Sequence, residues 1–451
     1  MNRHTESVQM DMLHGPLLKK LFIFALPLAA SSILQQLFNS ADTAVAGQFA
    51  GPLALAAVGG NSAIISLLIN MFVGFSVGAN VVISLLIGQK REKDVKDVVH
   101  TVMAMALISG FAMLIIGQAI ARPLLLLIDT PTDVLNMAEL YLRIFFCGMP
   151  FFMTYNFGSA VLRSIGDTRK PLYALLFAGV VNIVLNLLFV IVFHLSVAGV
   201  AIATVISDGI SAFFVIQFLR HADDIIQLHL HKLSLQREYV IKIIKIGLPA
   251  GLQGMVFSFS NVVIQSAING FGSAAVAGSA AAGNYETFVF YMNSAFCQAS
   301  TTFTGQNFGA GNFDRCKKIY RLSLFSAFLT TGIMCFIFGI GRCFFLHLFT
   351  RDPKAYYYAV IRLFKIGVLE FIPPAYEVTA ATLRGMGKSL FPSIVTVFGT
   401  CAVRIIFVLF FFPLIGSFSG LLNIYLISWL ITAVLMMGSY YIIRRKLFIV
   451  S

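Results

Sequence analysis

An acidic residue follows a long apolar segment near the start of the chain. Asp42 comes directly after Leu21–Ala41, twenty-one residues that carry no formal charge. Three polar residues precede it at spacings of four, four and three: Ser31, Gln35 and Asn39. These spacings place the four side chains on one face of a helix. A carboxylate inside a membrane is costly and marks a functional site by default, so Asp42 is a candidate for binding an ion.

The distance along the helix leaves a second interpretation open. Lys20 and Asp42 are separated by about 33 Å in a straight helix, which would place the carboxylate near the outer membrane surface. The polar stripe favours a protein cavity instead. Asn182 and Asn186, four residues apart on one face of a later apolar segment, are expected to share that cavity. The predicted ion-coupling residues of the first half are therefore Asp42, Asn39, Asn182 and Asn186.

The second half of the chain has acidic residues of its own. Glu286 shares a helix face with Asn293, and Glu370 and Glu377 are seven residues apart. Pro373 and Pro374 lie between the last two and would free backbone carbonyls to bind a cation. We predict a second ion-coupling site from Glu286, Glu377 and Glu370.

The composition indicates which elements position these residues. Of 451 residues, 58% are hydrophobic and 11% are charged, against roughly 25% charged in soluble domains. The sequence therefore predicts an all-α protein that crosses the membrane many times. Since a spanning helix needs roughly 20 apolar residues, we expect twelve spans, near 17–46, 53–87, 98–121, 135–161, 171–193, 198–219, 241–269, 275–304, 319–341, 356–382, 390–412 and 420–443.

The basic residues predict an orientation. If the N-terminus is cytoplasmic, 24 of the 32 Lys and Arg residues fall in cytoplasmic segments, as the positive-inside rule requires. The protein is then expected in the inner cell membrane. Its cytoplasmic parts are an N-terminal tail (1–16), a linker (220–240) and a C-terminal tail (444–451). The same bias explains the net charge of +13 without a nucleic acid partner. His229 and His231 lack a third ligand nearby, so a solvated linker is favoured over a metal site.

The two halves of the chain repeat each other. "VLRSIGDTRKPL" (161–172) matches "TLRGMGKSLFPS" (382–393) at an offset of 221, and Tyr155–Asn156 matches Tyr376–Glu377 at the same offset. Asn39 matches Asn261 at an offset of 222. Repeats of six spans each run parallel. We expect two pseudo-symmetric six-helix lobes, 17–219 and 241–443, around a central cavity.

The sequence resembles the multidrug and toxic compound extrusion (MATE) family over residues 15–445. The resemblance rests on "ALPLAASSILQQLFNSADTAVAGQFAGPLALAAVG" near the N-terminus, "VLRSIGDTRKP", "NIVLNLLFV", "GVAIATVISD" and "TLRGMG", in this order. It implies two six-helix lobes and an antiporter that exports cationic or amphiphilic compounds against inward H+ or Na+. It also implies that Asp42, in its D-T-x-x-x-G context, takes part in ion coupling. Proton-coupled prokaryotic members often have Asp where Asn186 stands, which leaves the coupling ion open.

The expected substrate cavity and the alternatives complete the prediction. Cavity candidates are Gln35, Tyr155, Asn156, Asn261 and Tyr376. A flippase of lipid-linked substrates would use the same design but needs interior bases, whereas the acids Asp42, Glu286 and Glu377 outnumber the interior base Arg404. A membrane-embedded enzyme would need a nucleophile or metal motif, and none is present in the sequence. We therefore expect a monomeric transporter in the lipid bilayer, with no cofactor and no metal beyond Na+.

Overall fold

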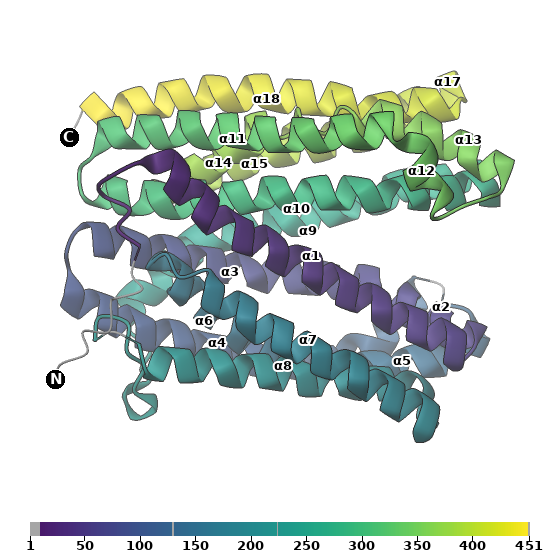
Figure 1. The fold of residues 1–451 in the computed structure, drawn as a ribbon, viewed down its shortest axis with the longest axis horizontal. Coiled ribbons are helices and arrows are strands. Elements are labelled where there is room, and N and C mark those ends of the chain that lie inside the picture. The colour runs from purple at the N-terminus through teal and green to yellow at the C-terminus, as the bar shows by residue number, and fades with distance from the viewer. Residues whose placement is uncertain (1–9, 129, 223, 450–451) are drawn as a thin grey trace. The chain divides into compact units, whose positions relative to one another are not determined.

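The computed structural model describes residues 10–128, 130–222 and 224–449, and in these ranges the regular structure is helical throughout (Figure 1). In the first half the helices are α1 (Leu17–Phe49), α2 (Pro52–Gly60), α3 (Ser62–Gly88), α4 (Glu92–Leu127), α5 (Thr132–Cys147), α6 (Met149–Ser164), α7 (Arg169–Leu187), η1 (Leu188–Val192), α8 (Ser196–Arg220) and η2 (Leu230–Lys232). In the second half they are α9 (Arg237–Asn269), α10 (Ser273–Gly309), α11 (Phe313–Ile340), α12 (Arg342–His347), α13 (Pro353–Arg362), η3 (Leu363–Gly367), α14 (Pro374–Gly385), α15 (Leu390–Thr396), η4 (Val397–Ala402), α16 (Val403–Ile406), η5 (Phe407–Phe411), α17 (Phe412–Ile415) and α18 (Phe418–Ile449).

Each predicted span overlaps one or more helices, but two of the spans are not continuous apolar helices. Among the described residues, nine helical stretches are long and apolar enough to cross a membrane, and α5 with α6, which meet at 47°, make a tenth. The other two predicted spans fall on α10 and on α13–α14. The helix α10 is rich in small and polar residues, and α13–α14 is interrupted before Pro374. A helix enclosed by other helices can be less apolar because lipid does not surround it.

The chain divides into two compact units. The first contains Ala30–Leu248, and the second contains Met12–Ala29 and the chain from Pro249 onward. Two of the boundaries cut a long helix near a proline: α1 is divided after Ala29, two residues beyond Pro27, and α9 is divided directly before Pro249. Proline removes a backbone hydrogen bond from a helix, so these are weak points in otherwise continuous rods.

The backbone repeats with the sequence. Left-handed residues recur in pairs 221 or 222 positions apart: Gly51 with Gly272, Lys90 with Gly311, Gly166 with Gly387, and His194 with Gly416. Gly51 and Gly272, with φ of 92° and 90°, precede α2 and α10. Such angles are rare for residues other than glycine. Their recurrence at one offset supports a duplication independently of the residue matches.

Glycines let helices approach closely within each unit. A Cβ on Gly110 of α4 would lie 2.5 Å from the Cα of Pro150 in α6. A Cβ on Gly278 of α10 would lie 2.3 Å from the carbonyl oxygen of Ala355 in α13. These are helix pairs with extensive contacts. Small residues at such crossings allow tight packing in membranes, where no hydrophobic effect drives helices together.

The linker between α8 and α9 is docked on the first unit. Ile226 and Leu228 are buried, and the backbone N–H of His229 donates to Nε2 of His100 in α4 at 3.1 Å. The N–H of Gln236 donates to the Thr101 hydroxyl at 3.3 Å. The expectation of a solvated linker was therefore wrong for these residues, because buried apolar side chains and backbone hydrogen bonds hold them in place.

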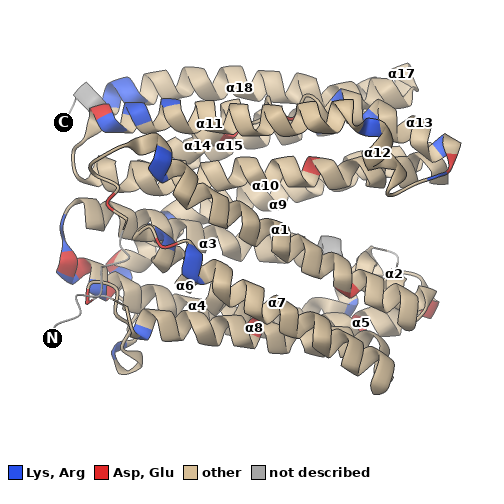
Figure 2. Ribbon diagram, in the orientation of Figure 1, with Lys and Arg blue, Asp and Glu red and all other residues tan. Residues whose placement is uncertain are grey.

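Basic residues gather at one end of the first unit. Twelve of the fourteen Lys and Arg residues between 30 and 248 lie near the connections α3–α4, α6–α7 and α8–α9 (Figure 2). The other two, Arg122 of α4 and Arg143 of α5, pair with Glu139 of α5. The charges thus separate along the helices as the positive-inside rule requires.

Candidate functional site

A buried polar cluster in the first unit joins α1, α7 and α8. Asp42 of α1 is 6% exposed, and Asn182 and Asn186 of α7 are 4% and 0% exposed. The Asn186 amide nitrogen donates to Oδ1 of Asp42 and to Oδ1 of Asn182 at 3.2 Å. The structure therefore brings together three of the four residues predicted for this site.

Thr204 of α8 completes the cluster. Its hydroxyl oxygen lies 3.1 Å from Oδ2 of Asp42 and 3.0 Å from the carbonyl oxygen of Val200. A hydroxyl has one hydrogen to donate. When Asp42 is ionised, Thr204 can donate to it. When Asp42 is protonated, it can donate to Thr204, which then donates to Val200. The same heavy-atom positions thus suit both states of the carboxyl group.

One oxygen of the cluster has no partner among the described residues. Oδ1 of Asn186 is buried without a hydrogen bond. The amide orientation is well determined, because the nitrogen of Asn186 serves two acceptors, Asp42 and Asn182. A buried carbonyl oxygen without a donor is uncommon in proteins. Beside a carboxylate, it is an oxygen ligand of the kind that hard cations prefer.

The other residues predicted for the first half lie outside this cluster. Gln35 and Asn39 are exposed on α1, and the Asn39 carbonyl accepts from Thr43. The Tyr155 hydroxyl donates to the carbonyl of Pro171 at 3.3 Å, and the Asn156 amide donates to the carbonyl of Phe152 at 2.8 Å. These last two side chains make local contacts with backbone.

In the second unit, Glu286 is neutralised by an arginine. Nε and a terminal nitrogen of Arg362 in α13 donate to the two carboxylate oxygens of Glu286 in α10, at 2.8 and 2.7 Å. Each side chain is 11% exposed. A cation at Glu286 would have to compete with a bidentate guanidinium.

A second buried arginine lies near this pair. Arg404 is 1% exposed and donates to the Ser428 hydroxyl at 3.1 Å and to Oδ1 of Asn261 at 3.3 Å. Its guanidinium lies 4.4 Å from the ring centroid of Tyr425, and Arg362 lies 6.0 Å from the same centroid. Tyr425 therefore contacts two cations.

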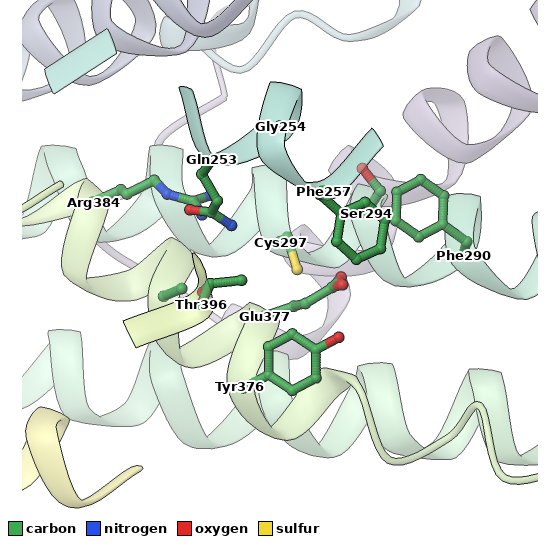
Figure 3. Close-up of a pocket in the computed structure, with 11 residues that line it drawn as sticks. Gln253, Gly254, Phe257, Phe290, Ser294, Cys297, Tyr376, Glu377, Arg384 and Thr396 are labelled. Atoms are coloured by element: carbon green, nitrogen blue, oxygen red, sulfur yellow. The ribbon is translucent and has the colours of Figure 1, made fainter. Parts of the chain in front are cut away.

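Glu377 lines a cavity of about 210 Å³ in the second unit. The Asn293 amide donates to Oε2 of Glu377 at 2.6 Å. The cavity combines aromatic rings with a carboxylate, a guanidinium, a thiol and an amide (Figure 3). Its lining residues are Gln253, Gly254, Phe257, Phe290, Ser294, Cys297, Tyr376, Glu377, Ala380, Arg384 and Thr396. An apolar wall with a few polar groups is typical of a small-molecule site.

Two of the charged side chains in this unit, Arg384 and Glu370, each have a buried atom without a hydrogen-bond partner among the described residues. Arg384 donates to Oε1 of Gln253 at 2.9 Å, but its Nε has no acceptor. Oε2 of Glu370 has no donor. Of the three acids predicted for this unit, Glu377 is the one that lines the cavity.

The comparison of interior acids with interior bases left out two arginines. Arg362 is partly buried beside Glu286 and Arg384 is partly buried in the Glu377 cavity. The prediction counted only Arg404 as an interior base: it placed Arg384 in a cytoplasmic segment and left Arg362, within the predicted span 356–382, uncounted. Arg362 is the last residue of the helix α13. The sequence predicted one continuous span here, whereas the structure has three separate helical segments, α13, η3 and α14. Thr204 was also missed, although it lies four residues before Asp208 on one face of α8.

Comparison with known proteins identifies the family. The family model MatE matches residues 27–188 and 249–410. The chain belongs to the MatE family. The two matched segments begin and end 222 residues apart, in agreement with the internal repeat. Membership makes the protein a multi-pass membrane transporter and not an enzyme, which confirms the resemblance and the all-helical fold class.

Relatives of this MatE protein carry names of drug exporters. It is 26% identical over 395 residues to "Probable multidrug resistance protein YoeA" of Bacillus subtilis, covering 86% of this chain and 85% of the relative. It is 33% identical over 312 residues to "Probable multidrug resistance protein YpnP" of the same organism, covering 68% of each. A structure described as the "Outward-facing conformation of a multidrug resistance MATE family transporter of the MOP superfamily" matches with a TM-score of 0.90 at 22% identity, covering 98% of this chain and 99% of that one.

Proposed function

We propose that this MatE protein exports cationic or amphiphilic compounds in exchange for a monovalent cation, and that the Asp42 cluster is the ion site. The observation that carries the proposal is a buried carboxylate held by Asn186 and Thr204 from two other helices. The names of its relatives as multidrug resistance proteins support export of drug-like compounds.

A proton is the coupling ion that the Thr204 geometry favours. Asp42 can gain or lose a proton while Thr204 reverses its hydrogen bond between Asp42 and the Val200 carbonyl. No heavy atom has to move for this exchange. A carboxylate needs partners when it is charged and buried, and the cluster supplies one donor to each oxygen.

Sodium is a second candidate, favoured by a different atom. Oδ1 of Asn186 has no donor among the described residues, and it belongs to the amide group whose nitrogen donates to Asp42. Carboxylate, amide and hydroxyl oxygens together form a ligand set for a hard cation. Among the described residues, no group of His, Cys, Asp and Glu is arranged to hold a metal through those side chains alone.

The Glu377 cavity is the substrate site that we propose for the second unit. Its rings and carboxylate suit an amphiphilic cation, since aromatic faces attract positive charge. Glu377 keeps one amide donor from Asn293, whereas Glu286 is already paired with Arg362. We therefore propose that Glu377 contacts the substrate, and that Glu286 and Glu370 do not.

The topology completes the proposal. Both termini and the linker at 220–240 face the cytoplasm of the cell membrane, as the separation of Lys and Arg favours. Single cysteines at positions 231, 196 and 417, in a background without other cysteines, test this orientation. Labelling of position 231 from outside intact cells as strongly as 196 or 417 would contradict it.

Proteoliposomes test the transport proposal. Purified protein is reconstituted, ethidium is loaded, and a pH jump or a sodium jump is imposed separately. We expect one jump to drive efflux in the wild type and neither to drive it in Asp42→Asn, which keeps the shape of the side chain. Asp133→Asn, at an exposed acid, is the matched control. Equal efflux by wild type and Asp42→Asn would refute the assignment of the ion site.

A further inference from the structure

A second cavity of the first unit lies between α4 and the docked linker. Its volume is about 220 Å³. Five basic side chains line it: Lys93, Lys96 and His100 from α4, and His229 and Lys232 from the linker. It is formed by residues far apart in the sequence, and neither transport nor the Asp42 cluster uses them.

Hydrogen bonds join α4 to the linker beside this cavity. His100 is buried, and its Nε2 accepts from the N–H of His229 while its Nδ1 lies 2.7 Å from the carbonyl of Lys96. With Nε2 as an acceptor, the ring carries its proton on Nδ1. The rings of His100 and His229 stack at 6.1 Å. The linker is therefore held to α4 by residues that line the cavity.

Positive charge exceeds negative charge around the cavity. Among the described residues its acids are Asp97 and Asp224. Asp224 is paired with Lys96, whose hydrogen bond and charge lower the pKa of the Asp224 carboxyl. Lys93 and Lys232 are exposed, and their ammonium groups have no hydrogen bond or ion pair with any residue that the structure describes.

The histidine on the linker responds to this excess. Burial, and then the charges of Lys232, His231 and His100, lower the pKa of His229, while Asp224 acts in the opposite direction. The cavity thus disfavours additional positive charge. An anion placed in it would offset the part of the pKa shift of His229 that comes from the neighbouring positive charges.

We propose that this cavity binds a phosphate group, supplied either by a soluble phosphate compound or by the headgroup of an anionic lipid. Lys93 and Lys232 provide the ammonium donors, one from each wall, and the exposed Ser234 hydroxyl at the rim is a third donor. Lysine binds phosphate as a point charge and needs no planar fork. A basic cleft at the cytoplasmic end of a membrane protein also meets anionic lipid headgroups.

Binding here has a consequence for the linker. A phosphate group between Lys93 and Lys232 would join α4 to the linker, which leads directly into α9. The helix α9 continues from the first unit into the second. The ligand would therefore stiffen the connection between the two units.

The test uses inorganic pyrophosphate with the purified protein in an uncharged detergent, measured by titration calorimetry. We expect Lys93→Gln/Lys232→Gln to weaken binding by about tenfold or more, because hydrogen bonds to charged groups are the strong ones. Lys388→Gln/Lys446→Gln removes two exposed basic residues of the second unit and is expected to bind as the wild type. Equal melting temperatures of the three proteins check that each is folded.

A second arm separates the two phosphate sources. The same proteins are extracted from vesicles of phosphatidylcholine and phosphatidylglycerol, and retained lipids are counted by native mass spectrometry. Weaker pyrophosphate binding by the Lys93/Lys232 variant indicates a soluble phosphate compound. Reduced retention of phosphatidylglycerol without pyrophosphate binding indicates a lipid headgroup. If neither ligand responds to that variant, or if the control loses as much, the site does not exist.

The pH dependence provides an independent readout. An anion beside His229 should raise its pKa, and by linkage protonation of His229 should strengthen pyrophosphate binding as the pH falls from 8 to 6. Because pyrophosphate also takes up a proton in this range, the effect of His229 is measured as the difference between the wild type and His229→Gln. The other titratable groups that face His229 are Lys93, Lys96, Asp97 and His100 from α4, and Asp224, His231 and Lys232 from the linker. His229→Gln should reduce this pH dependence; an unchanged dependence would contradict the site.

Discussion

Glu286 and Arg362, 76 residues apart in the sequence, form a bidentate ion pair inside the second unit. Breaking a buried pair leaves one charge without its partner, which typically costs about 3–5 kcal/mol. We therefore expect Arg362→Gln to lower the thermal stability of the purified protein strongly. The double variant Glu286→Gln/Arg362→Gln removes both charges, and we expect it to recover much of that loss.

The surface pair of Arg143 and Glu139 is the control for this prediction. The Arg143 side chain is 45% exposed, and exposed pairs contribute roughly 0–1 kcal/mol. Arg143→Gln should therefore change the melting temperature little. If the double variant is as unstable as Arg362→Gln, the lost stability comes from the contact between α10 and α13 and not from the unpaired charge.

Thr204 should be needed for its hydroxyl and not for its shape. Thr204→Val removes the partner of Oδ2 of Asp42, and leaving a buried polar group without a partner costs about 1–3 kcal/mol. We expect this variant to shift the pH dependence of ion-driven efflux, and Thr204→Ser to restore it. Efflux at a series of pH values in proteoliposomes measures the effect. Thr43→Val, at a hydroxyl that bonds the Asn39 carbonyl, is the control, and a Thr204→Val profile equal to it would exclude the relay.

Cys297 reports whether substrate enters the Glu377 cavity. Its thiol lines that cavity, whereas Cys316, Cys335 and Cys401 are buried elsewhere. In a Cys147→Ser/Cys343→Ser background, which removes the two exposed thiols, we expect a thiosulfonate reagent to modify Cys297 first. A transported dye should slow this reaction several-fold. Modification at the same rate with and without dye would place the substrate elsewhere.

The close contact of α10 with α13 depends on Gly278. Because a Cβ there would lie 2.3 Å from the Ala355 carbonyl oxygen, Gly278→Ala should destabilise the protein by about 1–3 kcal/mol, as overpacking does. Gly438→Ala in α18 is the matched control, since its Cβ would meet no atom within 4 Å. Alanine is the better helix former, so the control should melt at the same temperature or slightly higher. Equal loss in both variants would contradict the proposed contact.

Acidification should loosen the linker. Because the pKa of His229 is lowered in the docked linker, the undocked form binds more protons between the two pKa values. The stabilisation from neutral His229 is therefore present above the ordinary pKa of about 6.5, and it is lost as the pH falls. A spin label at an engineered cysteine replacing exposed Leu235 should become more mobile at pH 5.5 than at pH 7.5. His229→Gln should reduce this change, and an undiminished response would assign it to another group.

Much of the fold could be predicted from the sequence because its determinants are local or periodic. Apolar runs long enough to span a membrane must be helical, since lipid offers no hydrogen bonds to the backbone. The matches around Gly166 and Gly387 revealed the repeat, and the same glycines adopt left-handed angles. The polar spacing that singled out Asp42, and the pair Asn182 and Asn186, depended only on helix geometry.

The tertiary structure decided which of these polar residues act together. Helical spacing places a side chain on a face but does not say what faces it. Asn39 shares the stripe of Asp42 yet is exposed, while Thr204 comes from α8, 162 residues away, to contact Asp42. Likewise Glu286 is an acid in the sequence and half of an ion pair in the fold. The energy of a buried charge depends on its partners, and those partners come from helices that only the packing of the whole unit brings together.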